Sequence, residues 1–228
     1  MEQISQLLHM AAIWAVPLLL AITLHEAAHA YAAYELGDPT ARERGRMSLN
    51  PLRHVDPFGT VVLPLMLLVM NVGVIFGYAK PVPVDARRLR DPRGGMALVA
   101  LAGPASNLLQ ASIAVVLLRL LLHGGSEPGG LLHSMLTVAI YANCLLAILN
   151  MLPIPPLDGG RVLVALLPPP AGRALERFSR KGILVLLLLF LLLPMLSHRL
   201  ELPFDPLRFL VVGPAIWLAH QLMALGGL

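Results

Sequence analysis

Two histidines and a glutamate near the start of the chain have the spacing of metal ligands and a proton acceptor. The run reads His25-Glu26-Ala27-Ala28-His29. On a helix, residues i and i+4 lie one turn apart on the same face, so both imidazoles reach one ion. The glutamate between them then lies beside that ion, where it accepts a proton from attacking water. The run therefore predicts a catalytic metal site on a helix.

The surroundings of this run strengthen the prediction. An apolar stretch from Ile13 to Leu24 precedes it, and residues 30–33 continue the stretch. Ionisable side chains at membrane depth cost about 2.5–3.5 kcal/mol each. A bound divalent cation offsets that cost. The alternative is a helix end where the histidines and the glutamate simply reach water.

A third ligand is needed, because catalytic zinc sites combine three protein ligands with one open position. The candidate is Asp158, which follows a long apolar helix. The prolines of residues 153–156 must break that helix, and Gly159-Gly160 permits a sharp turn. Irregular backbone at membrane depth is tolerated only where it is buried in protein or lines a wet cavity. The alternative is that Asp158 caps a short helix starting near Arg161.

Composition points to a membrane protein. The chain has 228 residues, 57% of them hydrophobic and 13% charged, whereas a soluble domain is typically about a quarter charged. One cysteine, Cys144, excludes intrachain disulfides and a Cys-rich zinc site. We predict an all-α polytopic membrane protein, one membrane-embedded domain over 1–228. Its five expected spans are 8–36, 96–122, 131–152, 182–197 and 206–225. The catalytic core takes in about 8–167, and the accessory C-terminal helices about 182–225.

Lysine and arginine predict the orientation. They concentrate in the connectors 37–57, 78–95 and 168–181, while the first seven residues and 123–130 have none. Basic connectors face the cytoplasm in multi-pass proteins of the cell membrane. We therefore expect an external N-terminus and an active site toward the cytoplasm. The net charge of +4 is a topology signal rather than a nucleic-acid site.

The metal site also constrains the apolar run 58–77. The histidines and Asp158 must meet at one depth, so the helices 8–36 and 131–152 must run parallel. That is possible only if 58–77 does not cross the membrane. Both flanks of this run are basic, and Pro64 interrupts it. We predict a re-entrant or surface-lying element on the cytoplasmic side, with a small β-strand at 74–84 whose edge pairs with an unwound substrate segment.

These motifs together resemble the site-2 protease family of intramembrane zinc metalloproteases (peptidase M50). The resemblance is carried by H-E-x-x-H at 25–29, by Asn150-x-x-Pro153 leading into Leu157-Asp158-Gly159, and by Ala102-Gly103-Pro104 followed by Asn107. It covers roughly residues 20–165 and is greatest to the minimal prokaryotic members, which have no PDZ or CBS domain. It implies one Zn²⁺ per chain held by His25, His29 and Asp158, with Glu26 as catalytic base.

Three further polar residues are candidates for smaller roles. The resemblance suggests that Asn150 binds the substrate backbone, and Asn107 is a second candidate for that role. Either amide instead braces helix packing in the alternative interpretation. His54, in a polar loop before the 58–77 run, is either a regulatory or substrate contact or simply a solvated residue.

The sequence thus predicts an enzyme that cleaves peptide bonds in or near transmembrane segments. Its expected partners are single-span membrane proteins within a lipid bilayer, in regulated intramembrane proteolysis. The oligomeric state is left open. A metal transporter, or a membrane metal-binding protein without proteolytic activity, is the alternative. It explains the ligands but gives no purpose to Glu26.

Overall fold

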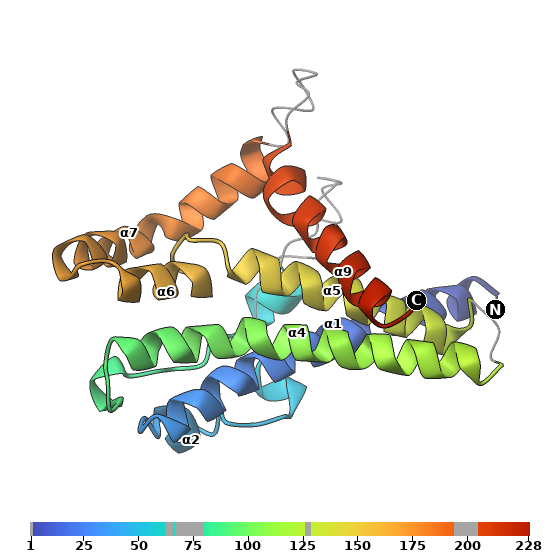
Figure 1. Ribbon diagram of the computed structural model, residues 1–228, viewed down its shortest axis with the longest axis horizontal. Helices are drawn as coiled ribbons and strands as arrows, with labels where there is room; N and C mark the ends of the chain where they lie inside the picture. Colours follow the sequence, from blue (N-terminus) through green and yellow to red (C-terminus); the bar gives the residue numbers. More distant parts are fainter. Residues whose placement is uncertain (1, 63–65, 67–79, 126–128, 194–204) are drawn as a thin grey trace.

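The described part of the chain is built from helices (Figure 1). The computed structural model describes residues 2–62, 66, 80–125, 129–193 and 205–228. Within these residues no β-strand occurs. The elements are α1 (Glu2–Glu35), α2 (Thr40–Glu43), η1 (Pro51–Arg53), η2 (Pro57–Val62), η3 (Ala86–Arg88), α4 (Gly94–His123), α5 (Leu131–Asn150), α6 (Asp158–Leu166), α7 (Pro169–Leu187), η4 (Leu188–Leu192), η5 (Arg208–Val212) and α9 (Gly213–Leu225).

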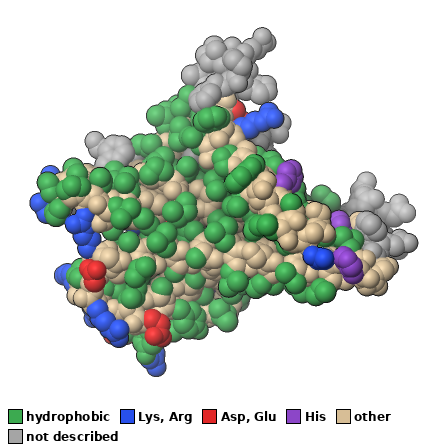
Figure 2. Space-filling view, in the orientation of Figure 1, with side chains coloured by type: hydrophobic (Ala, Val, Ile, Leu, Met, Phe, Trp, Pro, Cys, Tyr) green, Lys and Arg blue, Asp and Glu red, His purple; other side chains and the backbone are tan. Residues whose placement is uncertain are grey.

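Four described stretches are long and apolar enough to cross a membrane. They are Ala12–Glu35, Gly94–His123, Leu131–Asn150 and Arg208–Leu225. Large apolar side chains point outward, as Leu109 and Leu120 of α4 do with about 60% of their surface exposed. In Figure 2 hydrophobic side chains cover the middle of the molecule, and most charged side chains lie at one end. This distribution suits lipid contact, so the chain is a multi-pass membrane protein.

The expected fifth span, 182–197, is not confirmed. Its described part does not start a new helix at 182 but continues α7, which begins at Pro169. The first turns of α7 are amphipathic because they carry Arg173, Glu176 and Arg177. Residues 182–193 alone are too few to cross about 30 Å of hydrocarbon. The remainder of the predicted span, 194–197, lies outside the described residues.

The predicted strand at 74–84 is not confirmed either. Residues 74–79 lie outside the described part, and 80–84 form no ladder with another strand. Instead, residues 80–85, which we call the anchored segment, are tied to other parts of the protein. The N–H groups of Lys80, Val82 and Asp85 donate to His54 O (2.9 Å), Glu26 Oε2 (3.1 Å) and Asp38 Oδ2 (2.7 Å) respectively. Pro81 and Pro83 have no N–H to donate.

The relative direction of the long helices matches the expectation. Figure 1 shows α1 and α5 running the same way, with α4 running against both. The three helices pack on one another. The start of α4 returns to the end of α1, because Arg90 N–H donates to Leu36 O (2.9 Å) and Arg88 pairs with Glu43 (2.8 Å). The connector between α1 and α4 therefore begins and ends on one side of the bundle.

This return is the result expected if the 58–77 run does not make a single crossing. Of that run, only residues 58–62 and 66 are described, and 57–62 form the wide turn η2. The choice between a re-entrant and a surface-lying element lies outside the described residues.

Small residues let the helices approach closely. A cluster of buried side chains joins α4, α5 and α9, and its members are Ala111, Ala114, Val115, Leu118, Ile140, Cys144, Ala215 and Ala219. In lipid, such small side chains favour helix association because backbones come close and dispersion contacts multiply. This seam fixes α5 against α4 and so fixes the depth at which α5 ends.

Cysteine labelling tests the return of the connector. With Cys144 replaced by alanine, single cysteines at the exposed positions Arg44 and Arg90 should react with an impermeant reagent from the same side of sealed vesicles. A cysteine at Leu132, at the other end of the bundle, should react from the opposite side. Labelling of positions 44 and 90 from different sides would contradict the fold.

Candidate metal centre

Three side chains from two distant parts of the chain meet inside the helix bundle. His25 and His29 project from α1, and Asp158 is the first residue of α6. The two histidine Nε2 atoms are 3.0 Å apart, and each lies 3.2 Å from Asp158 Oδ2. All three residues are at least 93% buried. Ligand atoms on a tetrahedral zinc ion lie about 3.3–3.4 Å apart, from bond lengths of about 2.0–2.1 Å. The observed triangle is close to that size.

The chemistry of the triangle calls for a cation. His25 Nδ1 lies 2.6 Å from Asn107 Oδ1, and His29 Nδ1 lies 2.7 Å from Val99 O. Both oxygens are acceptors, so each Nδ1 carries the proton and each neutral ring turns an Nε2 lone pair toward Asp158. Two lone pairs and a carboxylate oxygen then converge in a buried space, where acceptors without a donor are strongly unfavourable. A divalent ion at the centre satisfies all three, so the residues present fit a metal.

Asp158 reaches the histidines because the chain turns sharply after α5. The helix ends at Asn150, and the prolines of residues 153–156 prevent its continuation. A Cβ at Gly159 would overlap the backbone of Met151, and one at Gly160 would overlap that of Pro155. Only glycine fits at these two positions, and the tight packing holds the first turn of α6 in place. The helix N-cap is Leu157, so Asp158 does not have the capping role of the alternative interpretation.

Glycine also allows α4 to pass directly beside the histidines. A Cβ built on Gly103 would overlap the imidazoles of both His25 and His29. Gly103 belongs to the run Ala102-Gly103-Pro104, so this run leaves open the space that the two rings occupy. The close approach of the two rings is the physical reason for glycine in this run.

Glu26 lies beside the triangle but faces another way. It is half-buried on α1, and its Oε2 accepts the N–H of Val82 (3.1 Å). Arg46 packs nearby and donates to the carbonyls of Arg53 and Lys80. Burial lowers the pKa of the Arg46 guanidinium, and the negative charge of Glu26 opposes that shift. The carboxylate is thus held at the edge of the site by a backbone donor and a nearby cation.

Comparison with known proteins identifies the family. The sequence profile of Peptidase family M50 matches residues 127–194. "Putative zinc metalloprotease YwhC" of Bacillus subtilis is 40% identical over 179 residues, which are 77% of this chain and 78% of the relative. The chain belongs to peptidase family M50. Proteins named "Putative zinc metalloprotease Rip2" from Mycolicibacterium smegmatis and Mycobacterium tuberculosis are each 32% identical, over 76% of this chain and 64% of the relative. No solved structure matches.

The two predicted substrate amides occupy different environments in this M50 protein. Asn107 is fully buried. Its Oδ1 accepts a hydrogen bond from His25 Nδ1, and its Nδ2 donates to Asn143 Oδ1 and to Ala21 O. Its geometry favours the bracing alternative, a positioning role behind His25. Asn150 is half-buried at the end of α5, and its Nδ2 donates to Leu146 O (3.0 Å) within its own helix. A substrate role for either residue stays a prediction.

His54 is not a solvated residue, which was the alternative to a regulatory or substrate contact. Only 2% of its surface is exposed, and its Nε2–H donates to Ser48 O (2.8 Å). Its carbonyl accepts from Lys80, at the start of the anchored segment. Among the described residues its Nδ1 has no hydrogen-bond partner. It is not in the His25, His29 and Asp158 group that could hold a metal.

Sequence reasoning missed Asn143, which lies behind Asn107. Asn143 Nδ2 donates to Ala139 O (2.9 Å), so its oxygen faces Asn107 and accepts from Asn107 Nδ2 (2.8 Å). This leaves the Asn107 oxygen to accept from His25, which directs the His25 lone pair at the metal position. The signal was available, because an amide within an apolar helix needs a buried partner. Its spacing of seven residues from Asn150 also places both on one face of α5.

Asn143→Leu tests this chain of amides. The variant frees both Asn107 and His25 to reorient, so Zn²⁺ affinity should fall by about 10–100-fold, as for other partners behind metal ligands. Competition with a chromogenic chelator measures the change. Thr137→Val, which removes a hydroxyl from the same helix away from the site, is the matched control and should retain the wild-type affinity. Equal affinities for Asn143→Leu and the control would contradict the positioning role.

Gly103→Ala tests the close approach of α4. The added methyl should displace the imidazoles, so the variant should lose Zn²⁺ affinity by about tenfold or more. Gly95→Ala on the same helix is the control, because its Cβ would meet Leu89 at 3.4 Å, an ordinary contact. Zinc content of the two purified variants by atomic absorption, at matched helicity, distinguishes the cases. Full zinc occupancy in Gly103→Ala would show that the space is not needed.

Proposed function

We propose that this M50 protein is an intramembrane zinc metalloprotease that hydrolyses peptide bonds in or near transmembrane segments of single-span membrane proteins. The observation that carries the proposal is the buried triangle of His25, His29 and Asp158 within an apolar helix bundle. The name of the Bacillus subtilis relative, "Putative zinc metalloprotease YwhC", agrees with this chemistry. One Zn²⁺ per chain follows from the single triangle among the described residues.

The residues divide into ligands and a base. His25, His29 and Asp158 would hold the ion, and Asn107 and the carbonyl of Val99 orient the two rings. When bound in such a site, zinc polarises the substrate carbonyl and makes water a better nucleophile. Glu26 accepts the proton of the attacking water and returns it to the leaving amine. The Val82 N–H keeps Glu26 at the edge of the site, where its carboxylate remains accessible to water. The peptide bond is hydrolysed without a covalent acyl-enzyme.

The setting in the membrane is part of the proposal. The basic connectors lie at the end of the bundle where α1 ends and α6 begins. With these connectors in the cytoplasm of a cell-membrane protein, the N-terminus is external and the site opens toward the cytoplasmic side. Cleavage there releases the cytoplasmic part of a substrate, as regulated intramembrane proteolysis requires. Of the C-terminal part, α9 packs against α4 and α5, so it completes the bundle or gates lateral substrate entry.

Substrate binding requires an unwound peptide beside the metal. Asn150 ends α5 close to the turn that presents Asp158, and this position supports the proposal that its amide binds substrate backbone. The anchored segment provides backbone acceptors, since the carbonyls of residues 81–84 make no hydrogen bonds within the described part. A substrate along this segment can donate hydrogen bonds to these carbonyls but can accept few in return, because most N–H groups of the segment are already bonded or absent.

Glu26→Gln is the direct test of catalysis. The variant keeps the ligands but loses the base, so Zn²⁺ content should stay at one per chain while cleavage falls by about 10²–10⁴-fold. The assay uses purified protein in liposomes with a panel of single-span substrates and gel-resolved products. Glu35→Gln, an exposed glutamate on the same helix, is the matched control and should cleave at the wild-type rate.

Removal of the metal completes this test. Dialysis against a chelator should stop cleavage, and added Zn²⁺ should restore it in wild type but not in Glu26→Gln. Zinc movement across the liposome membrane without cleavage would instead support the alternative, a metal transporter. Tight zinc binding with neither activity would support a membrane metal-binding protein.

A further inference from the structure

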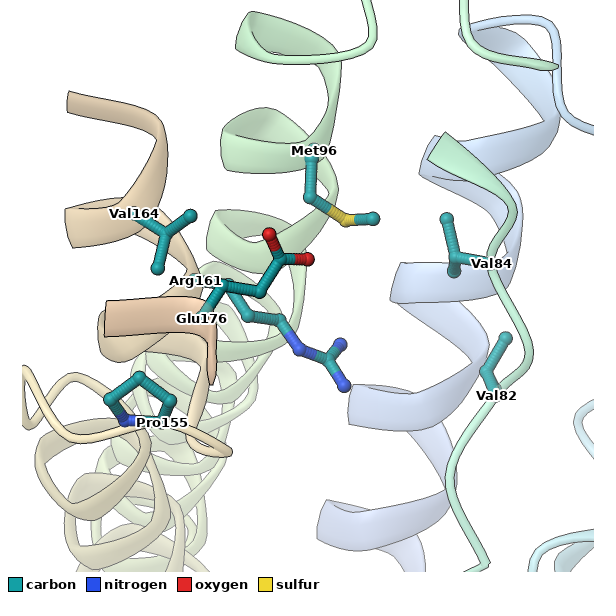
Figure 3. Close-up of a pocket in the computed structure, with 7 residues that line it drawn as sticks. All are labelled: Val82, Val84, Met96, Pro155, Arg161, Val164 and Glu176. Atoms are coloured by element: carbon teal, nitrogen blue, oxygen red, sulfur yellow. The ribbon is translucent and has the colours of Figure 1, made fainter. Parts of the chain in front are cut away.

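A cavity of about 210 Å³ lies beside α6, the helix that begins at Asp158 (Figure 3). Val82 and Val84 of the anchored segment form one wall, and Val164 of α6 lies opposite them. Met96 of α4 and the buried Pro155 close the remaining sides. Sites for whole small molecules usually measure about 300–1,000 Å³. This cavity is therefore the size of one large side chain, and five of the seven residues that line it are apolar.

The position of the cavity relates it to the reaction. Arg161 lies about one turn beyond Asp158 on α6, and Val164 lies about one turn beyond Arg161. With a rise of 1.5 Å per residue, the cavity residues Arg161 and Val164 follow the metal ligand by about 4.5 and 9 Å along the helix axis. An extended peptide advances about 3.3 Å per residue. A substrate strand with its scissile bond at the metal would thus bring a side chain two or three residues away into the cavity.

The anchored segment can pair with the N–H groups of such a substrate strand but not with most of its carbonyl groups. Its carbonyls at residues 81–84 can accept substrate N–H groups. Its own donors are used by His54, Glu26 and Asp38, or are absent at the two prolines, which leaves only the N–H of Val84. Carbonyl groups of an unwound substrate that become buried against the protein need donors, because an unpaired buried acceptor is unfavourable. Those donors must come from across the cavity.

Arg161 is placed to supply them. Figure 3 shows its guanidinium projecting from α6 into the space facing the segment of Val82 and Val84. The residue is half-buried, and its side chain makes no ion pair or hydrogen bond with any described residue. Guanidinium offers five donors in a fixed plane, enough to serve more than one carbonyl. Glu176 also lines the cavity, which balances the charge and argues against a carboxylate as guest.

We propose that this cavity is the substrate subsite that determines sequence preference: it takes one large apolar side chain two or three residues from the scissile bond, while Arg161 donates to the substrate backbone. The proposal rests on the proposed function and adds its substrate class, a transmembrane segment with a Leu- or Phe-sized residue at one fixed distance from the cleaved bond. Apolar walls select the side chain, and the arginine serves the backbone regardless of sequence.

A substrate panel with cavity variants tests the apolar subsite. Single-span substrates carry Ala, Leu or Phe at each of four positions on either side of the cleaved bond, with the enzyme in liposomes. Wild type should prefer Leu over Ala at one position by about tenfold or more in kcat/KM. Val164→Phe narrows the cavity, so the Leu-to-Ala ratio at that position should drop by about tenfold. Val164→Ala widens it and should shift the preference toward Phe.

The control is Leu166→Phe, which enlarges a side chain of the same helix that is 74% exposed and outside the cavity. It should leave the Leu-to-Ala ratio unchanged at every substrate position. Ratios that stay at the wild-type value in both Val164 variants would overturn the subsite. Wild type that cleaves no substrate while holding zinc would refute the proposed function instead, and the subsite with it.

Variants of Arg161 test its proposed contact with the substrate backbone. Arg161→Met should raise KM for the whole panel by a similar factor, about tenfold, with Zn²⁺ content unchanged, because a backbone contact does not distinguish side chains. Arg161→Lys, which keeps the charge and three donors, should recover part of the loss. A rise in KM confined to substrates with Asp or Glu near the bond would show that Arg161 binds a side-chain carboxylate and would overturn its backbone role.

Discussion

The structure depends on three hydrogen-bond acceptors being forced together in a buried place. The Nε2 atoms of His25 and His29 and the carboxylate of Asp158 repel one another unless a cation lies between them. Protons at both Nδ1 positions, bonded to Asn107 and Val99, remove the option of turning the rings. The arrangement therefore fits a metal site, and such a site in turn requires α1 and the start of α6 to share one depth. That requirement sets the direction of α5 and returns the connector between α1 and α4 to its starting side.

Much of this was predictable because the decisive signals are local. The spacing of His25 and His29 predicts a shared ligand position from the geometry of one helical turn alone. The prolines before Asp158 predict the end of a helix in any structural context. Parallel α1 and α5 followed from joining these two facts to the distribution of arginine. Each step rests on residues that are close in sequence or on a rule of membrane insertion, so no knowledge of side-chain packing was required.

The predictions that failed or were incomplete concern long-range partners. The apolar length of 182–197 suggested a separate span. However, α7 starts earlier, at Pro169, and its first turns carry charged residues whose placement depends on the neighbouring α6. A strand was predicted at 74–84, but the N–H groups of the anchored segment at 80–85 instead bond to Glu26, His54 and Asp38, from three other parts of the chain. Asn143 escaped notice because its importance depends on Asn107, 36 residues away. Sequence periodicity contains no information on such pairings.

The anchored segment links catalysis to recognition through its backbone. Each N–H that bonds to Glu26 or His54 is unavailable to a substrate, so the segment that fixes the proposed base cannot also form a full ladder with a substrate peptide. Recognition must then be completed from the facing wall, which is α6. That helix begins with Asp158, the proposed metal ligand, and continues with Arg161 and Val164, so one rigid element would set the distance between the ion and the proposed side-chain subsite. Specificity by position along the substrate, rather than by a long sequence motif, is the physical consequence of this arrangement.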